Sequence, residues 1–130
     1  EDIGNADPMA LVVATAAAQA VEHVGMPECA HALAQCAVYL SLAPKSNAAY
    51  QALNRAREFV REHGAELPPD HLRSRVRGGG GYDYPHDRPG HLSPQELMPE
   101  EYAGVRFYEP DEQEAGLAER LARIRAARGR

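Results

Sequence analysis

The residues Leu40-Ser41-Leu42-Ala43-Pro44-Lys45-Ser46-Asn47-Ala48-Ala49-Tyr50 end one alanine-rich helical pattern and begin the next. Pro44 has no backbone N–H and disfavours helical geometry at Ala43, so the first helix is expected to end there. The hydroxyl of Ser46 can accept a hydrogen bond from the next turn, which predicts that Ser46 caps the following helix. Lys45 is the first basic residue of the chain. The corner therefore separates two helices and two regions of different charge.

Three helices are predicted around this corner, two before it and one after it. Asp7-Pro8 begins the first, because an acid before a proline is typical of a helix start, and Gly25 ends it. Met26-Pro27 begins the second, and the third runs from about Asn47 to His63. Apolar residues recur at three- and four-residue steps in each, and short connections favour antiparallel neighbours. Residues 7–64 are therefore predicted to form a helical core of three antiparallel helices.

Residues 65–110 form an irregular arm rich in proline and glycine. Residues 82–87 and 105–108 have β-like aromatic content, and two arrangements stay open for them: a short two-stranded ribbon, or extended arms packed on the helices. Ser93-Pro94-Gln95-Glu96 resembles a short helix start. A last helix is predicted over 111–128, with early acids and late arginines that match the helix dipole. The predicted fold is thus a mostly α helical bundle in one domain over 1–130.

Composition excludes several classes of protein. The net charge of -5 argues against a dedicated duplex-DNA binder, although residues 45–77 carry seven bases and four acids. Cys29 and Cys36 lie seven residues apart on one predicted helix, about 10.5 Å along its axis, which is too far for a disulfide. No signal peptide and no apolar run long enough to span a membrane is found, so no membrane association is expected.

No catalytic, cofactor-binding or metal-binding residues are predicted. Gly78 to Gly81 is not followed by Lys-Ser or Lys-Thr, as a phosphate-binding loop would be, and a flexible linker explains it better. His86, Asp87 and His91 have ligand chemistry, but their loop lacks metal-site spacing and a local turn is favoured. One set of basic residues could contact DNA phosphates. It consists of Lys45, Arg55, Arg73, Arg75 and Arg77.

Five motifs occur in a fixed order along the chain. They are Glu1-Asp2-Ile3-Gly4-Asn5-Ala6-Asp7-Pro8, Leu42-Ala43-Pro44-Lys45-Ser46-Asn47-Ala48, His71-Leu72-Arg73, Tyr82-Asp83-Tyr84-Pro85-His86-Asp87 and Arg106-Phe107-Tyr108-Glu109-Pro110. Together they resemble the C-terminal region of the replication-associated recombination protein A family, also called maintenance-of-genome-stability protein A. These are AAA+ ATPases related to the Werner-helicase-interacting protein and to clamp loaders. In one respect the chain departs from the family pattern, because residues 74–81 are short and glycine-rich.

The resemblance implies a homotetramerisation domain, without enzymatic activity of its own, of an ATPase that maintains replication forks and acts in recombination and repair. The ATPase core and lid would precede Glu1, so ATP and magnesium are cofactors of the parent protein and none is expected here. Implied partners are further copies of the chain, DNA through the parent protein, and single-stranded-DNA-binding protein, in the cytoplasm at the nucleoid. The alternative function is a DNA-binding module that contacts phosphates through the basic region 45–77.

Overall fold

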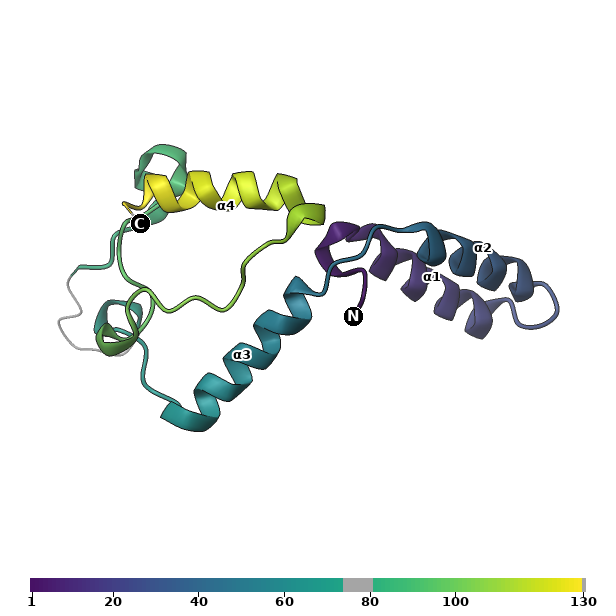
Figure 1. Ribbon diagram of the computed structural model, residues 1–130, viewed down its shortest axis with the longest axis horizontal. Helices are drawn as coiled ribbons and strands as arrows, with labels where there is room; N and C mark the ends of the chain where they lie inside the picture. Colours follow the sequence, from purple (N-terminus) through teal and green to yellow (C-terminus); the bar gives the residue numbers. More distant parts are fainter. Residues whose placement is uncertain (74–80, 130) are drawn as a thin grey trace. The chain divides into compact units, whose positions relative to one another are not determined.

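The computed structural model describes residues 1–73 and 81–129 and is helical where it is regular (Figure 1). Its four α-helices are α1 (Met9–His23), α2 (Cys29–Leu42), α3 (Ala48–His63) and α4 (Ala115–Ala127). Six short 3-10 turns complete the regular structure of these residues: η1 (Gly4–Ala6), η2 (Asp70–Leu72), η3 (Pro85–Asp87), η4 (Pro89–His91), η5 (Glu100–Tyr102) and η6 (Glu112–Glu114). The mostly helical fold class is confirmed.

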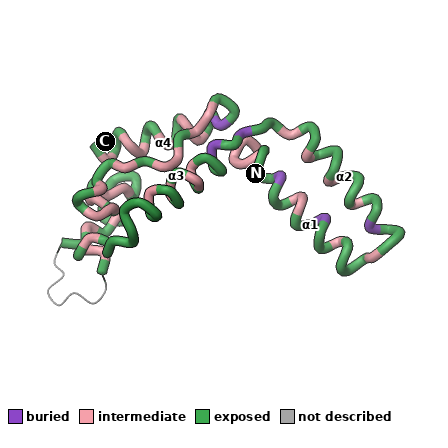
Figure 2. The backbone as a smooth tube through the Cα atoms, turned by 60° about the horizontal axis from the view of Figure 1, so that its bottom comes forward, coloured by how far each residue is buried: buried purple, intermediate pink, exposed green. Residues whose placement is uncertain are grey.

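The chain divides into two compact units. Unit 1 comprises Glu1–Leu53 with Tyr108–Ala115, and unit 2 comprises Asn54–Phe107 with the residues from Gly116 onward. Of the residues that the structure describes, every fully buried one lies in unit 1 (Figure 2). A single domain over 1–130 with a core at 7–64 remains a prediction, and each unit is described by itself below.

Unit 1 is built on an antiparallel pair of helices, α1 and α2, which lie side by side (Figure 1). Mainly small side chains line the space between them, among them Ala17 of α1, which is 6% exposed, and Ala32 and Cys36 of α2. Alanine at a helix contact permits close approach but buries little apolar area, so each contact contributes little. The two cysteines are free, as the spacing predicted.

The corner between α2 and α3 has the predicted geometry. The second helix ends at Leu42, and Ala43 is extended with φ -65° and ψ 144°, as a residue before proline prefers. The Ser46 hydroxyl accepts a hydrogen bond from the Ala48 N–H at 3.2 Å, at the first turn of α3. Ser46 is 3% exposed, so its polar group is buried and satisfied by this bond.

Unit 2 is organised around one aromatic residue of α3. The Phe59 ring lies 4.9 Å from the ring of Tyr102 and 5.4 Å from that of Phe107, both in edge-to-face geometry. The ring of Phe107 therefore attaches the segment before it to α3. Burial raises the pKa of Tyr102, and the nearby acids Glu101 and Glu66 add to this effect.

Of the two arrangements left open for residues 82–87 and 105–108, the two-stranded ribbon does not form, since no strand occurs within 1–73 or 81–129. Packing on a helix holds for the second segment, because Phe107 contacts Phe59 of α3. Residues 93–96 do not start a helix either. The Ser93 hydroxyl accepts from the Gln95 N–H at 3.1 Å, but it also donates to Asp83 at 2.8 Å, which fixes the segment as an extended connection.

Candidate interaction surfaces

The outward faces of α1 and α2 are apolar although they are exposed. Leu11 is 76% exposed and Val12 57% on α1, and Val38 is 60% and Leu42 80% exposed on α2. Monomeric proteins rarely leave large aliphatic side chains in contiguous exposed groups of this kind. The pair therefore presents apolar surface on its outside while its own seam contains mainly small residues.

These side chains line two apolar grooves. The α2 groove has a volume of about 600 Å³ and is lined by Asp7, Ala34, Gln35, Val38, Tyr39, Leu42, Ala43 and Pro44. The α1 groove is smaller, about 280 Å³, and is lined by Leu11, Val12, Thr15, Ala16 and Gln19. The two grooves share no lining residue. Neither contains a lysine or arginine, and their one charged lining residue, Asp7, is hydrogen-bonded to Tyr39.

A polar contact at one edge keeps the α2 groove in shape. The Tyr39 hydroxyl donates to Asp7 Oδ2 at 2.6 Å, and Asp7 Oδ1 accepts from the Met9 N–H at 3.0 Å. The hydrogen bond to Asp7 raises the pKa of Tyr39. Asp7 therefore joins the start of α1 to the side of α2, which holds the helix pair at this end of the groove.

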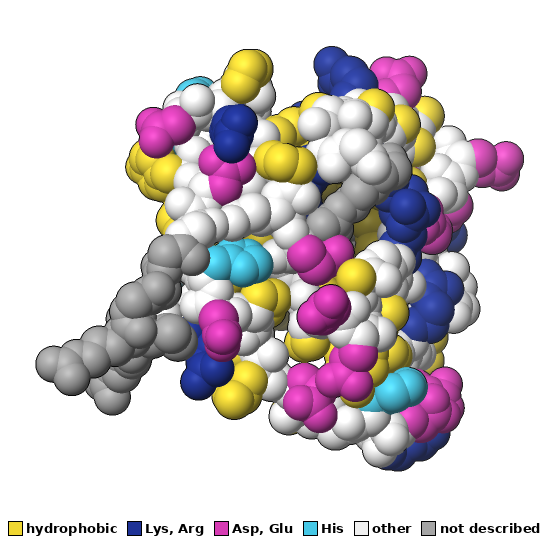
Figure 3. All heavy atoms as spheres, turned by 90° about the vertical axis from the view of Figure 1, so that its left-hand side faces the viewer, with side chains coloured by type: hydrophobic (Ala, Val, Ile, Leu, Met, Phe, Trp, Pro, Cys, Tyr) yellow, Lys and Arg dark blue, Asp and Glu magenta, His cyan; other side chains and the backbone are white. Residues whose placement is uncertain are grey.

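The described residues predicted to contact DNA are divided between the two units. Lys45 is exposed in unit 1, whereas Arg55 and Arg73 belong to unit 2. Arg55 Nε donates to the carbonyl of Phe107 at 2.8 Å, and Arg73 forms an ion pair with Asp70 at 2.8 Å. Arg75 and Arg77 lie outside the described residues. In the face seen in Figure 3, Lys and Arg side chains are interspersed with Asp and Glu. Phosphate contact by this set remains a prediction.

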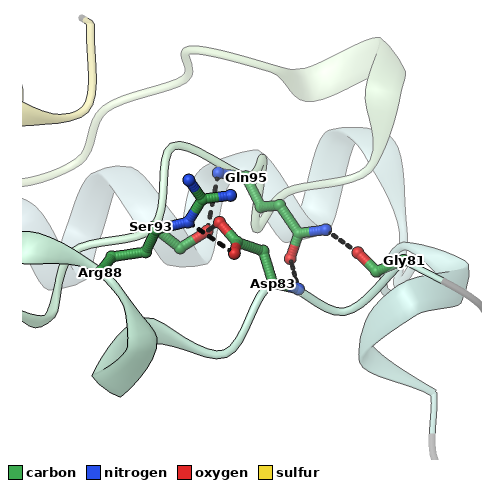
Figure 4. A network of polar contacts seen from close by, with 5 residues as sticks. All are labelled: Gly81, Asp83, Arg88, Ser93 and Gln95. Carbon is green, nitrogen blue, oxygen red and sulfur yellow. Dashed lines mark hydrogen bonds and ion pairs between the residues drawn. The ribbon is translucent and has the colours of Figure 1, made fainter.

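A network centred on Asp83 holds the loop of residues 81–95 (Figure 4). The Asp83 carboxylate accepts from Arg88 Nε and from the Ser93 hydroxyl, each at 2.8 Å. The Gln95 side chain accepts from the Asp83 N–H at 2.8 Å and donates to the carbonyl of Gly81. Arg128, which directly follows α4, donates to the Gln95 carbonyl at 2.5 Å. Long-range side-chain bonds of this kind cannot be predicted from spacing.

Protonation of Asp83 is expected to loosen this loop. The hydrogen bond from Arg88, assisted by that from Ser93, lowers the pKa of Asp83 below its ordinary value of 3.8. Because the folded-state pKa is the lower one, the contribution to stability is present above pH 3.8 and is lost as the pH falls through the folded-state value. Carboxyl NMR titration should show Asp83 of Arg88→Met titrating at higher pH than in the wild type, with Ser41→Ala as an unaffected control. Equal titration in all three proteins would contradict the assignment.

Metal chemistry finds no support in the described part of the chain. His86 and His91 lie close, with ring centroids 4.8 Å apart, but no group of three or more His, Cys, Asp or Glu side chains among the described residues could hold an ion. Pro85–Asp87 is a 3-10 turn, as the turn interpretation predicted. Within these same residues, no helix is long and apolar enough to cross a membrane.

Comparison with known proteins identifies the family. A family model described as MgsA AAA+ ATPase C terminal matches residues 1–125. The chain belongs to this family. The family resemblance inferred from the five motifs is thereby confirmed.

Named relatives agree with the family model. The replication-associated recombination protein A of Escherichia coli strain K12 is 39% identical over 94% of this chain and 30% of its own length. The protein of the same name from Haemophilus influenzae is 37% identical, over 96% of this chain and 30% of its length. An ATPase WRNIP1 of Dictyostelium discoideum is 41% identical, over 84% of this chain and 13% of its length. The chain thus spans less than a third of these relatives.

Proposed function

We propose that this chain is the homotetramerisation domain of a clamp-loader-like AAA+ ATPase that acts in replication-fork maintenance, recombination and repair. The observation that carries the proposal is the pair of exposed apolar grooves on α1 and α2. Burying an exposed valine or leucine contributes about 1.5–3 kcal/mol. Two grooves of this kind on one subunit fit an assembly with two distinct interfaces, in which each groove meets its counterpart on another copy.

In this proposal the chain performs no chemistry. The family model and the relatives' names refer to an AAA+ ATPase, so nucleotide hydrolysis with ATP and magnesium belongs to the parent protein. The domain would hold four such ATPase modules together. Contacts with DNA and with single-stranded-DNA-binding protein, and a place at the nucleoid in the cytoplasm, belong to the same proposal and rest on the relatives' role in replication-associated recombination.

Light scattering of the chain at micromolar concentration tests the assembly. We expect the mass of four 14.2 kDa chains. Val38→Glu/Leu42→Glu should weaken association through the α2 groove at least about a hundredfold and leave dimers, because two aliphatic contacts are replaced by charge. Leu11→Glu/Val12→Glu should do the same through the α1 groove, and combining both pairs should give monomers.

A matched control separates the grooves from exposed apolar residues in general. Leu67 is 67% exposed and lies in unit 2, so Leu67→Glu should leave the tetramer intact. Because the substituted side chains are exposed within one subunit, circular dichroism should show unchanged helix content. A wild-type chain that is monomeric at these concentrations would refute the proposal, and tetramers that survive all four substitutions would place the interfaces elsewhere.

A further inference from the structure

A third hollow of unit 1 lies where the first residues of the chain meet α1 and the corner between α2 and α3. It has a volume of about 700 Å³, and residues 1–5 line one side of it. The apolar part of its lining comes mainly from α1 and from the end of α2, and the corner and α3 supply the rest. The residues that matter below are Ala10, Leu11, Ala14, Leu40, Lys45 and Ala49. We call this hollow the corner pocket.

The side of the corner pocket formed by residues 1–5 is fixed before anything binds. A Cβ on Gly4 would lie 2.7 Å from the carbonyl oxygen of Ser46, so the backbone of η1 rests against the corner. Asn5 Nδ2 donates to the Tyr108 hydroxyl at 3.4 Å, which ties the same turn to the segment before α4. A pocket that exists in advance requires little ordering when it is filled.

The polar groups of the corner pocket do not favour a small polar ligand. Asn5 is bonded to Tyr108, and the Ser41 hydroxyl donates to the carbonyl of Ala37. Lys45 is the one lysine of the sequence, is exposed, and has no ion-pair partner within the described part of the chain. Small-molecule sites place several converging polar groups in an apolar lining. The lining of this pocket therefore suits an apolar segment of polypeptide better.

We propose, on the basis of the proposed function, that the polypeptide preceding Glu1 in the parent protein docks an apolar segment in the corner pocket. The family model is described as the C terminal part of an AAA+ ATPase, and the chain matches 30% of the length of the Escherichia coli relative. In the proposed function the ATPase module accordingly precedes Glu1. Because Glu1 itself lines the pocket, the segment attached to it starts at the pocket's edge.

This attachment makes a modest apolar contact sufficient. A short tether gives an effective concentration in the millimolar range, so a segment that would bind weakly as a free peptide occupies the pocket most of the time. Lys45 suits a segment that ends as a helix, because a lysine is favourable beside the free carbonyl groups of a helix C-terminus. Leu11 lines both the corner pocket and the α1 groove. The docked segment would thus connect the ATPase module to a surface used for assembly.

Cysteine labelling of the chain and of the parent protein tests the docking. Ala49 is exposed and lines the corner pocket, whereas Gln51 is exposed on α3 and does not line it. Ala49→Cys should react with N-ethylmaleimide about tenfold or more slowly in the parent protein than in the chain. Gln51→Cys should react equally in both. Mass spectrometry of the tryptic peptide 46–55 reports on either position and excludes Cys29 and Cys36.

A charge placed in the pocket should remove the difference. Ala14→Glu, added to Ala49→Cys in both proteins, should make the two labelling rates equal, because it puts a carboxylate among the apolar lining. Ala18→Glu is the matched control, since Ala18 lies one turn further along α1, is exposed and does not line the pocket. It should preserve the slower labelling of the parent protein. If Ala14→Glu does not fold, the comparison of Ala49→Cys with Gln51→Cys remains decisive.

Three results would overturn the proposal. The first is equal labelling of Ala49→Cys in the chain and in the parent protein. The second is equal protection of Gln51→Cys in the parent protein, which would indicate general shielding of α3. The third is loss of the protection in Val38→Glu/Leu42→Glu, which would assign it to a second copy. A monomeric chain would refute the assembly proposal without altering the comparison of labelling rates, so the two failures are distinguishable.

Discussion

Replacing Gly4 with alanine is expected to lower the free energy of unfolding by about 2–4 kcal/mol. A Cβ at this position would lie 2.7 Å from the carbonyl oxygen of Ser46, closer than such atoms come in folded proteins. The oxygen belongs to the backbone of a residue that is only 3% exposed, so it cannot move aside freely. Gly4 also has φ +51°, a left-handed conformation that costs an alanine about 1 kcal/mol. The steric contact and the unfavourable φ both destabilise the turn η1.

Gly25 provides the matched control for this prediction. It lies in the same unit and has φ +75°, but a Cβ there would meet nothing within 4 Å. Gly25→Ala should therefore show only the conformational cost, about 1 kcal/mol. Urea unfolding at one fixed protein concentration measures both variants, since association would otherwise contribute to stability. Equal destabilisation by the two substitutions would show that the contact between η1 and the corner does not constrain Gly4.

The sequence predicts what neighbouring residues determine. Pro44 ends α2 and Ser46 caps α3, because each acts within a few residues through a missing donor or an available oxygen. Short connections predict antiparallel neighbours among the first three helices, and α1 and α2 form such a pair. The family motifs predict the family. These parts of the fold follow from local rules.

Contacts across long stretches of sequence could not be predicted. Leu53 and Val60 fit the periodic apolar stripe of α3, yet they are 48% and 53% exposed. Phe59 beside them makes the packing contacts of this helix, because Tyr102 and Phe107 reach it from more than forty residues away. The candidate surfaces show the same limit. Their residues are recognisable as apolar or aromatic, but the sequence does not indicate that they stay exposed.

Glu114 illustrates the limit most clearly. Its position near the start of the last helix predicts an exposed acid that favours the helix dipole. In the structure it is 3% exposed, and its Oε2 accepts a hydrogen bond from the Tyr108 hydroxyl at 2.7 Å. Asn5 Nδ2 donates to the same hydroxyl at 3.4 Å. Nothing in the spacing of these residues indicates that the beginning of the chain and the segment before α4 share a buried polar contact.

Replacing Tyr108 with phenylalanine is expected to lower the free energy of unfolding by about 2–3 kcal/mol. The substitution keeps the ring but removes the donor to Glu114, and a hydrogen bond to a charged group that is lost in a buried place costs this much. Glu114 Oε1 already has no hydrogen-bond partner among the described residues, so the carboxylate would be left without a side-chain donor there. Tyr39→Phe is the control, because it removes a tyrosine hydroxyl bond to Asp7 in an exposed setting, where water replaces the lost bond, and it should cost much less.

Two further measurements link the cost to the carboxylate. In Tyr108→Phe/Glu114→Leu both polar partners are absent, so the double variant should be more stable than the sum of the single effects predicts.

Burial, together with the bond to Glu114, raises the pKa of Tyr108 above its ordinary value of 10.0. The folded state therefore favours the neutral phenol, and its contribution to stability is present below pH 10.0 and is lost as the pH rises through the folded-state pKa. The free energy of unfolding of Tyr108→Phe should therefore fall less at alkaline pH than that of the wild type. Strict additivity in the double variant, with an unchanged alkaline decline, would mean that Tyr108 stabilises unit 1 through its ring alone.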